Sequence, residues 1–283
     1  MLDIGKYAFS GCVALHRFII PSNVTKIDRA FFDGMQTIIN KSSKITELAK
    51  DVFKSESIIE FKGVWASEDN RALIRDGEMI AFARGALTEY VVPSGVISIA
   101  SDVFNDCNKL TRIVLPDGLR KIGDSTFEQC NQMKSINIPE SLEEVGPYAF
   151  QFCVMLTDVM LPDKLVSIPR GMFNGCWNLR SVTLGDNVKS IGEYAFSECR
   201  LLESIRIPDT IETVSENVFN NCYQLREIDC KYSTADKRAL IMNNVLLAFA
   251  PSGVKQFVIP SGVTRVGNMA FVNCKELEDI TIP

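Results

Sequence analysis

The sequence predicts a β-rich solenoid that is wound as a right-handed coil of about 11–12 turns. Its class is α/β if short helical segments connect the strands. Three residue types recur every 23 residues, in register over six copies. They are a cysteine (Cys107, Cys130, Cys153, Cys176, Cys199, Cys222), a phenylalanine (Phe104, Phe127, Phe150, Phe173, Phe196, Phe219) and a branched aliphatic residue (Ile99, Ile122, Val145, Ile168, Ile191, Val214). Because one such unit cannot bury its own apolar side, stacked copies must build a shared core.

The first part of each repeat is predicted to be a short strand. In the copy Leu110–Cys130, Ile113 and Leu115 lie two residues apart, so both side chains point to the same, inward face. Pro116 ends the strand, because proline has no N–H to donate to a sheet.

The second part of the repeat returns the chain to the start of the next strand. Leu119 and Ile122 form a second apolar pair, and Gly123 is predicted to permit a tight turn. A short helical or irregular segment is then expected to carry Phe127 and Cys130 inward.

Copies near the N-terminus are less regular. Phe9 and Phe32 hold the phenylalanine position in the first two copies, and the copy around Ile45 and Phe53 is two residues short. We expect the same core columns to extend to the N-terminus with local irregularity.

Two inserts interrupt the repeat, at 62–86 and 231–253 of a single domain that spans 1–283. Both contain Arg-Ala-Leu-Ile, and both reach Pro-Ser-Gly-Val 22 residues later, so they are copies of one module. Asp76-Gly77 between two apolar runs is a strong hairpin signal, and Asn243-Asn244 lies at the matching place. Each insert is predicted to be a β-hairpin that extends the sheet or projects from its rim.

The composition argues against nucleic-acid binding and membrane insertion. The formal net charge is -5, with 35 acidic and 30 basic residues, so no basic footprint for nucleic acid is present. No apolar run approaches the ~20 residues that a membrane helix needs. The N-terminus has no charged region followed by an apolar stretch, so the chain carries no signal peptide.

Catalytic chemistry has little support in the sequence, and no catalytic residue, metal site or cofactor is predicted. The chain has nine cysteines, one histidine (His16) and no CxxC pair, a poor inventory for a metal site. Since a free cysteine behaves as a small apolar residue, the cysteine column is predicted to be a row of buried thiols. His16 is predicted to be a solvated side chain.

With these motifs in place, the chain resembles the BspA-like, or Treponema-type, leucine-rich repeat family. The residues that carry the resemblance are the pattern I-P-x-x-V-x-x-I-G-x-x-A-F-x-x-C, as in Ile138–Cys153, and the Asp-Gly hairpin insert. The resemblance covers nearly the whole chain and implies a leucine-rich-repeat coil. It also implies a non-catalytic adhesion or protein-recognition module of a bacterial cell-surface or secreted protein.

The outward-pointing residues of the predicted strands form the candidate binding surface. In a solenoid these strands present an extended concave face, and we expect a partner to bind there. The candidate partner-binding residues are Arg17, Glu89, Arg112, Asn137, Asp158, Met160, Thr183, Arg206, Glu227 and Asp229. The expected partner is a host matrix protein, a bacterial surface protein or a glycan.

Three alternatives stay open at this stage. The chain is a glycan-binding module, or the targeting arm of an enzyme whose catalytic domain lies outside it. Alternatively, aromatic residues of the Phe/Cys segment, which are expected mostly to pack along the coil, form a rival contact patch (Tyr148, Phe152, Trp177, Tyr194 and Tyr223). Neither end resembles a polar cap, so we expect an excised fragment of a longer protein, or ends that a partner covers. Uncapped strand edges also favour end-to-end self-association.

Overall fold

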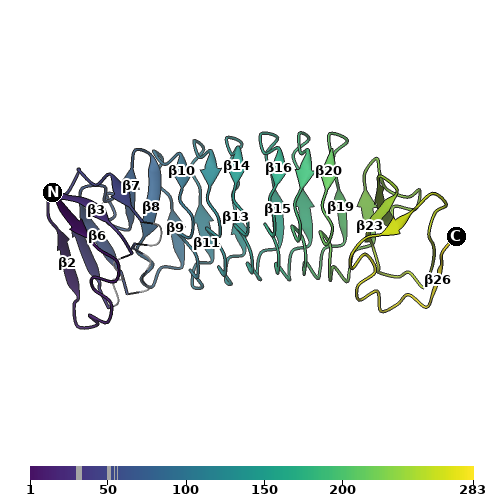
Figure 1. Cartoon of the computed structure of the whole chain (residues 1–283), viewed down its shortest axis with the longest axis horizontal. Helices are drawn as coiled ribbons and strands as arrows, with labels where there is room; N and C mark the ends of the chain where they lie inside the picture. The colour runs from purple at the N-terminus through teal and green to yellow at the C-terminus, as the bar shows by residue number, and fades with distance from the viewer. Residues whose placement is uncertain (30–33, 50–51, 54, 56) are drawn as a thin grey trace.

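The computed structural model shows an elongated stack of about twelve coils with the two termini at opposite ends (Figure 1). It describes residues 1–29, 34–49, 52–53, 55 and 57–283, so Phe32 lies outside the described residues. Within those ranges the regular structure is all β-strand, and turns connect the strands. The solenoid prediction is confirmed, and the segments expected to be helical or irregular are turns.

Two rows of parallel strands run along the stack. The first row, which we call the first-strand face, holds the strands predicted from the repeat. It consists of β2 (Arg17–Ile20), β4 (Thr37–Asn40), β6 (Glu60–Gly63), β9 (Glu89–Val91), β11 (Arg112–Val114), β13 (Ser135–Ile136), β15 (Asp158–Met160), β17 (Ser181–Thr183), β19 (Ser204–Arg206), β21 (Glu227–Asp229), β24 (Gln256–Val258) and β26 (Asp279–Thr281).

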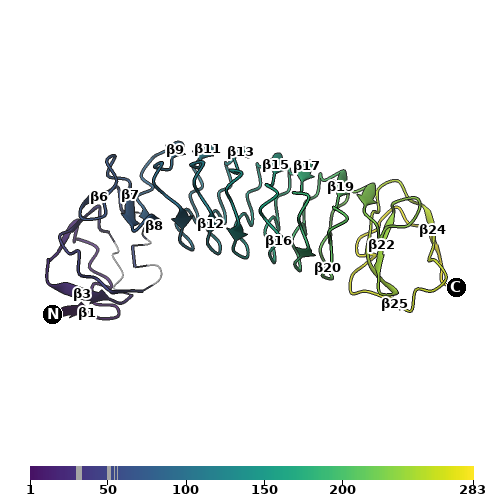
Figure 2. The ribbon, with the colours of Figure 1, turned by 90° about the horizontal axis from the view of Figure 1, so that it is seen from above.

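The second row, which we call the second-strand face, contains mostly shorter strands from the return half of each repeat. It consists of β1 (Leu2–Ile4), β3 (Val24–Ile27), β5 (Glu47–Leu48), β8 (Glu78–Phe82), β10 (Ser98–Ile99), β12 (Lys121–Ile122), β14 (Glu144–Val145), β16 (Ser167–Ile168), β18 (Ser190–Ile191), β20 (Thr213–Val214), β23 (Val245–Phe249) and β25 (Arg265–Val266). In Figure 2 the strands β9 to β17 of the first row and β12, β16 and β20 of the second lie on opposite sides of the central coils.

The repeated apolar residues form continuous columns between the two faces. Ile113, Leu115, Leu119 and Ile122 are all buried, as their spacing predicts. Six phenylalanine rings stack from coil to coil, with centroids 5.2 to 5.7 Å apart and interplanar angles of 10° to 14°. They are Phe104, Phe127, Phe150, Phe173, Phe196 and Phe219.

The cysteine column is buried and its thiols are free, which confirms the structural interpretation. The thiol of Cys153 donates a hydrogen bond to the carbonyl of Phe127 in the preceding coil, with 3.1 Å between sulfur and oxygen. Cys130, Cys176, Cys199 and Cys222 repeat this bond at 3.1 to 3.3 Å. A small side chain with one weak donor therefore fits this position, because it fills the core and also satisfies a carbonyl.

The arc that carries each phenylalanine and cysteine turns sharply at two positions with left-handed backbone. In one coil these are Ser125 (φ 49°) and Gln129 (φ 61°), and in the next Tyr148 (φ 59°) and Phe152 (φ 57°). The arc is held to its neighbour by amides such as that of Phe127, which donates to the carbonyl of Ala149 at 2.8 Å. The repeat thus accepts strained backbone in exchange for a third row of hydrogen bonds between coils.

The repeat glycine has a different role from the predicted one. The φ of Gly123 is not in the left-handed range, so it does not provide the tight turn. A side chain there would meet the backbone amide of Ser101 at 2.4 Å, in the preceding coil. Glycine is required because two coils approach closely at this point.

Both inserts contain the predicted β-hairpin. β7 (Ala72–Arg75) pairs with β8, and β22 (Ala239–Met242) pairs with β23, both antiparallel. Each two-residue turn has positive φ at both positions, 51° and 79° at Asp76-Gly77 and 51° and 62° at Asn243-Asn244. These are the values of a type I′ turn, which the sequence motif favours.

The hairpins separate three apolar cores. β8 and β23 each continue the second-strand face, because they pair in parallel with β10 and β25. In the first hairpin, Leu73 and Ala81 pack in the N-terminal core, whereas Ala72, Met79 and Phe82 pack in the central core.

The second hairpin repeats the arrangement between the central and C-terminal cores. Leu240 and Ala248 pack on the central side, and Ala239, Leu246 and Phe249 pack on the C-terminal side. Each hairpin is therefore a two-sided wall inside the stack. In Figure 2 the coils beyond the hairpins are seen more nearly face-on than the central coils, so the stack changes direction at both walls.

Candidate recognition surface

The central part of the first-strand face, from β9 to β21, brings most of the predicted binding residues together. Strand pairing aligns them within two sheets, β9–β11–β13 and β15–β17–β19–β21, and β13 lies next to β15 without pairing to it. The repeat thus places these residues in two columns with one residue per coil, about 4.8 Å apart. The first column is Glu89, Arg112, Ser135, Asp158, Ser181, Ser204 and Glu227. The second is Val91, Val114, Asn137, Met160, Thr183, Arg206 and Asp229.

Arg17 lies apart from the other predicted residues. It is exposed on β2, in the separate sheet β2–β4–β6 that packs on the N-terminal core. The first hairpin stands between this sheet and β9, so the structure divides the predicted surface into sections.

Two arginines on the central surface have no partner within the described ranges. The guanidinium groups of Arg112 and Arg206 are exposed and make no hydrogen bond, ion pair or cation–π contact there. Their donors are therefore available to acceptors from another molecule.

The second-strand face differs in this respect, because its lysines are paired along the stack. Lys121 lies 2.8 Å from the carboxylate of Glu144, and Lys189 lies 3.1 Å from that of Glu212. Lys26 forms the same kind of pair with Glu47 near the N-terminus. Lysines of this face are thus paired with glutamates of neighbouring coils.

Acidic residues at the C-terminal end of the central surface bind a lysine from the hairpin module. The ammonium of Lys237 lies 2.7 Å from Glu227 and 3.2 Å from Asp229. These two carboxylates raise the pKa of Lys237 above its ordinary value. In the middle of the surface, Ser181 donates to Asp158 at 2.6 Å and lowers the pKa of that carboxyl.

Asn137 has a structural use on this surface. Its side-chain amide donates to the carbonyl of Leu115 and accepts from the amide of Leu115, both at 2.9 Å. The side chain thus completes the strand pairing where β13 ends early. Its hydrogen-bonding groups are occupied by the fold.

Apolar side chains lie among the polar ones. Met160 is 69% exposed and Val91 is 65% exposed, both in the second column. An exposed methionine between polar neighbours offers an adaptable contact for a partner. The surface combines free guanidinium groups, short hydroxyl side chains and exposed apolar contacts.

Within the residues that the structure describes, no group of three or more His, Cys, Asp or Glu side chains has the arrangement of a metal site. Nδ1 of His16 lies 3.3 Å from the carbonyl oxygen of Gly34, and the side chain is exposed. In the same part of the chain, no helix has the length and apolar character needed to span a membrane.

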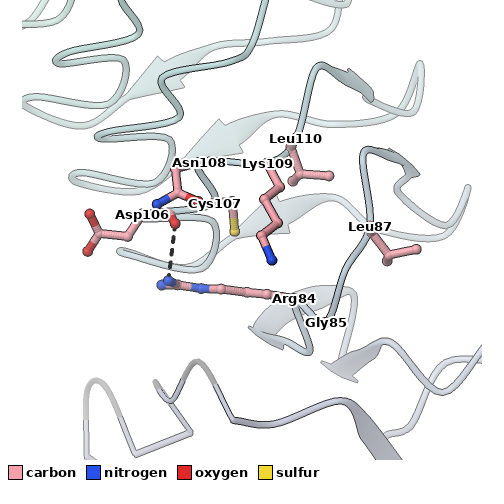
Figure 3. A pocket seen from close by; sticks show the side chains of 8 residues that line it. All are labelled: Arg84, Gly85, Leu87, Asp106, Cys107, Asn108, Lys109 and Leu110. Atoms are coloured by element: carbon pink, nitrogen blue, oxygen red, sulfur yellow. Dashed lines mark hydrogen bonds between the residues drawn. The ribbon is translucent and has the colours of Figure 1, made fainter.

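A pocket of about 110 Å³ lies where the first hairpin rejoins the central coils (Figure 3). The guanidinium of Arg84 reaches across it to the carbonyl oxygens of Asn105 and Asp106. In later coils the carbonyl at the Asn105 position accepts a hydrogen bond from a backbone amide of the preceding coil. The carbonyl of Glu128, for example, accepts from the amide of Asp106. Arg84 therefore caps the first arc of the central stack, a role that the repeat pattern does not reveal.

The comparisons with known proteins agree with this architecture. A family model for the BspA type leucine rich repeat region, in six copies, matches residues 1–64, 78–200, 144–245 and 246–283. The matched ranges leave out 65–77, which contains β7. No curated protein matches the sequence.

Solved structures of bacterial repeat proteins share the fold. A leucine rich cell surface protein from Faecalibacterium prausnitzii has a TM-score of 0.64 and 25% identity, over 94% of this chain and 69% of that one. A leucine-rich repeat protein from Eubacterium ventriosum has a TM-score of 0.61 and 21% identity, over 75% of this chain and 60% of that one. A leucine-rich repeat protein from Bacteroides ovatus has a TM-score of 0.51 and 20% identity, over 99% of this chain and 82% of that one.

The repeat spacing, the stacked coils and the family match agree. The chain belongs to the BspA-type leucine-rich repeat family, whose members are repeat scaffolds and generally not catalytic.

Proposed function

We propose that this chain is a non-catalytic protein-recognition module of a bacterial surface or secreted protein, and that the β9–β21 part of the first-strand face binds the partner. The similar leucine rich protein from Faecalibacterium prausnitzii is a cell surface protein, which supports the location. The chain spans 60% of the length of the Eubacterium ventriosum protein. The role as part of a longer surface protein therefore belongs to this proposal.

The observation that carries the proposal is the contrast between the two faces. On the second-strand face the lysines of neighbouring coils bind glutamates, whereas Arg112 and Arg206 on the first-strand face have no such partner among the described residues. Exposed, unpaired guanidinium groups on the same surface as the exposed Met160 provide the mixture of arginine and apolar contacts that is typical of protein interfaces.

A direct test measures binding to immobilised fibronectin, laminin and collagen, as representative matrix proteins. We expect the wild-type chain to bind at least one of them. The variant Arg112→Ala/Asp158→Ala/Arg206→Ala should bind about tenfold more weakly or worse, because loss of one arginine hot spot costs about 2 kcal/mol and about 1.4 kcal/mol is already tenfold.

A matched control removes three charges from the other face, in the variant Lys121→Ala/Glu144→Ala/Lys189→Ala. This variant should keep wild-type binding, and both variants should keep the wild-type melting temperature within a few degrees. Equal binding by the wild type and the first variant, or no binding of wild type to any matrix protein, would contradict the proposal.

A further inference from the structure

The arcs of three neighbouring central coils carry four aromatic side chains. We call Tyr148, Phe152, Trp177 and Tyr194 the arc aromatic cluster. Phe152 is 37% and Trp177 40% exposed, and the two tyrosines are partly buried. The cluster lies away from both strand faces, because the arc joins the end of one second-strand segment to the next first-strand segment.

Two glycines hold rings of the cluster against the next coil. A side-chain carbon on Gly171 would lie 2.4 Å from the ring of Tyr148, and one on Gly175 would lie 2.3 Å from the ring of Phe152. Both rings therefore occupy space that any other residue would fill. The rings are positioned before a partner arrives, which lowers the entropy cost of binding.

An arginine lies over each of the other two rings, those of Trp177 and Tyr194, and a glutamate neutralises each arginine. The guanidinium of Arg200 lies 4.5 Å from the ring centroid of Trp177 and 3.0 Å from the carboxylate of Glu198. Arg170 lies 5.5 Å from the centroid of Tyr194 and 3.3 Å from Glu193.

The charges around the cluster thus balance in pairs. The arginines and glutamates beside the rings carry equal numbers of positive and negative charges. The cluster therefore favours an uncharged partner over an acidic or basic one.

We propose that the arc aromatic cluster binds a neutral, β-linked glycan chain. In such chains the C–H groups on the ring faces pack on aromatic side chains, and the hydroxyl groups suit bidentate partners such as Arg200 and Glu198. The coils repeat every ~4.8 Å, close to the length that one pyranose adds to an extended β-linked chain. A glycan that runs along the stack therefore meets about one coil per sugar.

The test uses cellohexaose and xylohexaose as probes and maltohexaose, an α-linked chain with a helical shape, as the comparison. The chain has two tryptophans, so Trp65→Phe leaves Trp177 as the fluorescent reporter. We expect one of the β-linked hexasaccharides to shift the Trp177 emission with saturation and maltohexaose to leave it unchanged. Calorimetry should show at least about tenfold weaker binding for Phe152→Ala and for Trp177→Ala.

Two controls separate this site from the proposed protein-binding face. The variant Arg112→Ala/Asp158→Ala/Arg206→Ala should bind the hexasaccharide as the wild type does. Phe152 and Trp177 are only 37% and 40% exposed, so their alanine variants should lose some packing and melt a few degrees lower. Circular dichroism should show both variants folded at the temperature of the binding assay.

The proposal is overturned if neither β-linked probe binds at millimolar concentration, or if Phe152→Ala/Trp177→Ala binds as well as the wild type. Loss of matrix-protein binding in that double variant, without any glycan binding, would identify a protein contact there instead.

Discussion

The central stack and the C-terminal stack are built from the same repeat, but their aromatic cores pack differently. In the centre, six phenylalanine rings lie nearly parallel, at interplanar angles of 10° to 14°. Beyond the second hairpin, Phe249, Phe257 and Phe271 meet at angles of 45° to 61°. A ring in the parallel stack needs a coil of the same shape on each side. Next to a hairpin one of these coils is replaced by a different structure, so the rings there no longer lie parallel.

The first hairpin shows the same break at the other end of the central stack. Phe82, Tyr90 and Phe104 meet at angles of 47° to 53°, with centroid distances close to those of the C-terminal cluster. The tilted cluster is therefore a property of the module that follows a hairpin. We expect the central stack to unfold as one unit and the end stacks to behave separately.

Alkaline pH should produce the largest effect, and it should act mainly on the central stack. Burial raises the pKa of the thiols of Cys130, Cys153, Cys176, Cys199 and Cys222 above their ordinary value. The unfolded chain releases these protons near pH 8.5. The stability is therefore complete below about pH 8.5 and falls at higher pH, by up to about 1.4 kcal/mol per pH unit for each thiol.

Urea unfolding at pH 7, 8, 9 and 10 measures this loss. The variant Cys153→Ala/Cys176→Ala should show a shallower decline above pH 8.5, because two of the titrating thiols are absent. An identical decline in the wild type and this variant would show that other groups cause it.

Replacing Phe150 with alanine should cost about 3–5 kcal/mol in the free energy of unfolding. The ring is fully buried between Phe127 and Phe173. Phe271→Ala should cost less, because that ring is only partly buried in the C-terminal core. Chemical denaturation gives both values, and equal costs would remove the distinction between the parallel and tilted stacks.

Leu246→Ala should separate the C-terminal stack from the rest. This side chain is buried on the C-terminal side of the second hairpin, so its loss should cost that core about 2–5 kcal/mol. Hydrogen exchange should become faster in β24 and β26 while the amides of β11 to β19 keep their protection. A uniform increase along the chain would mean that the three cores unfold together.

The smallest expected effect is a gain in stability. Gln129 has a φ of 61°, and Gly175 holds the equivalent position two coils later with a φ of 76°. Gln129→Gly should stabilise the chain by roughly 0.5–1 kcal/mol, because left-handed backbone costs other residues more than glycine. The reverse change, Gly175→Gln, should destabilise it, since the new side chain would also meet Phe152. Thermal denaturation of the two variants measures both changes. A lower melting temperature for Gln129→Gly as well would show that the left-handed backbone at Gln129 is not strained.

The sequence predicts the repeating part of the fold well, because one spacing determines several features at once. The inward positions of Ile113 and Leu115, the buried thiols and both hairpin turns follow from period and turn chemistry. The division of 1–283 into one domain with inserts at 62–86 and 231–253 stays a prediction.

Other features had no readable signal. Gln129 and Tyr148 are poor indicators of left-handed backbone, which is normally recognised by glycine or asparagine. The side-chain amide of Asn137 takes the place of a missing backbone pair, a local hydrogen-bonding role that spacing does not reveal, and its place in the partner-binding surface stays a prediction.

The two-sided hairpins did leave a signal that alternation alone misses. The run Met79–Ala83 is apolar at every position, which is typical of a strand buried on both faces. The two faces contact different cores, so the run belongs to a wall between coils and not to the rim of the sheet.

The hairpins also bear on how such a chain changes in length over generations. Each presents one apolar side to the coils before it and another to those after it, and the coils between present equivalent surfaces to one another. An in-frame deletion or duplication of one 23-residue unit, such as 116–138, would rejoin matching surfaces and leave both walls unchanged. Unequal crossing-over within the gene can therefore alter the reach of the protein without requiring any new solution to its folding.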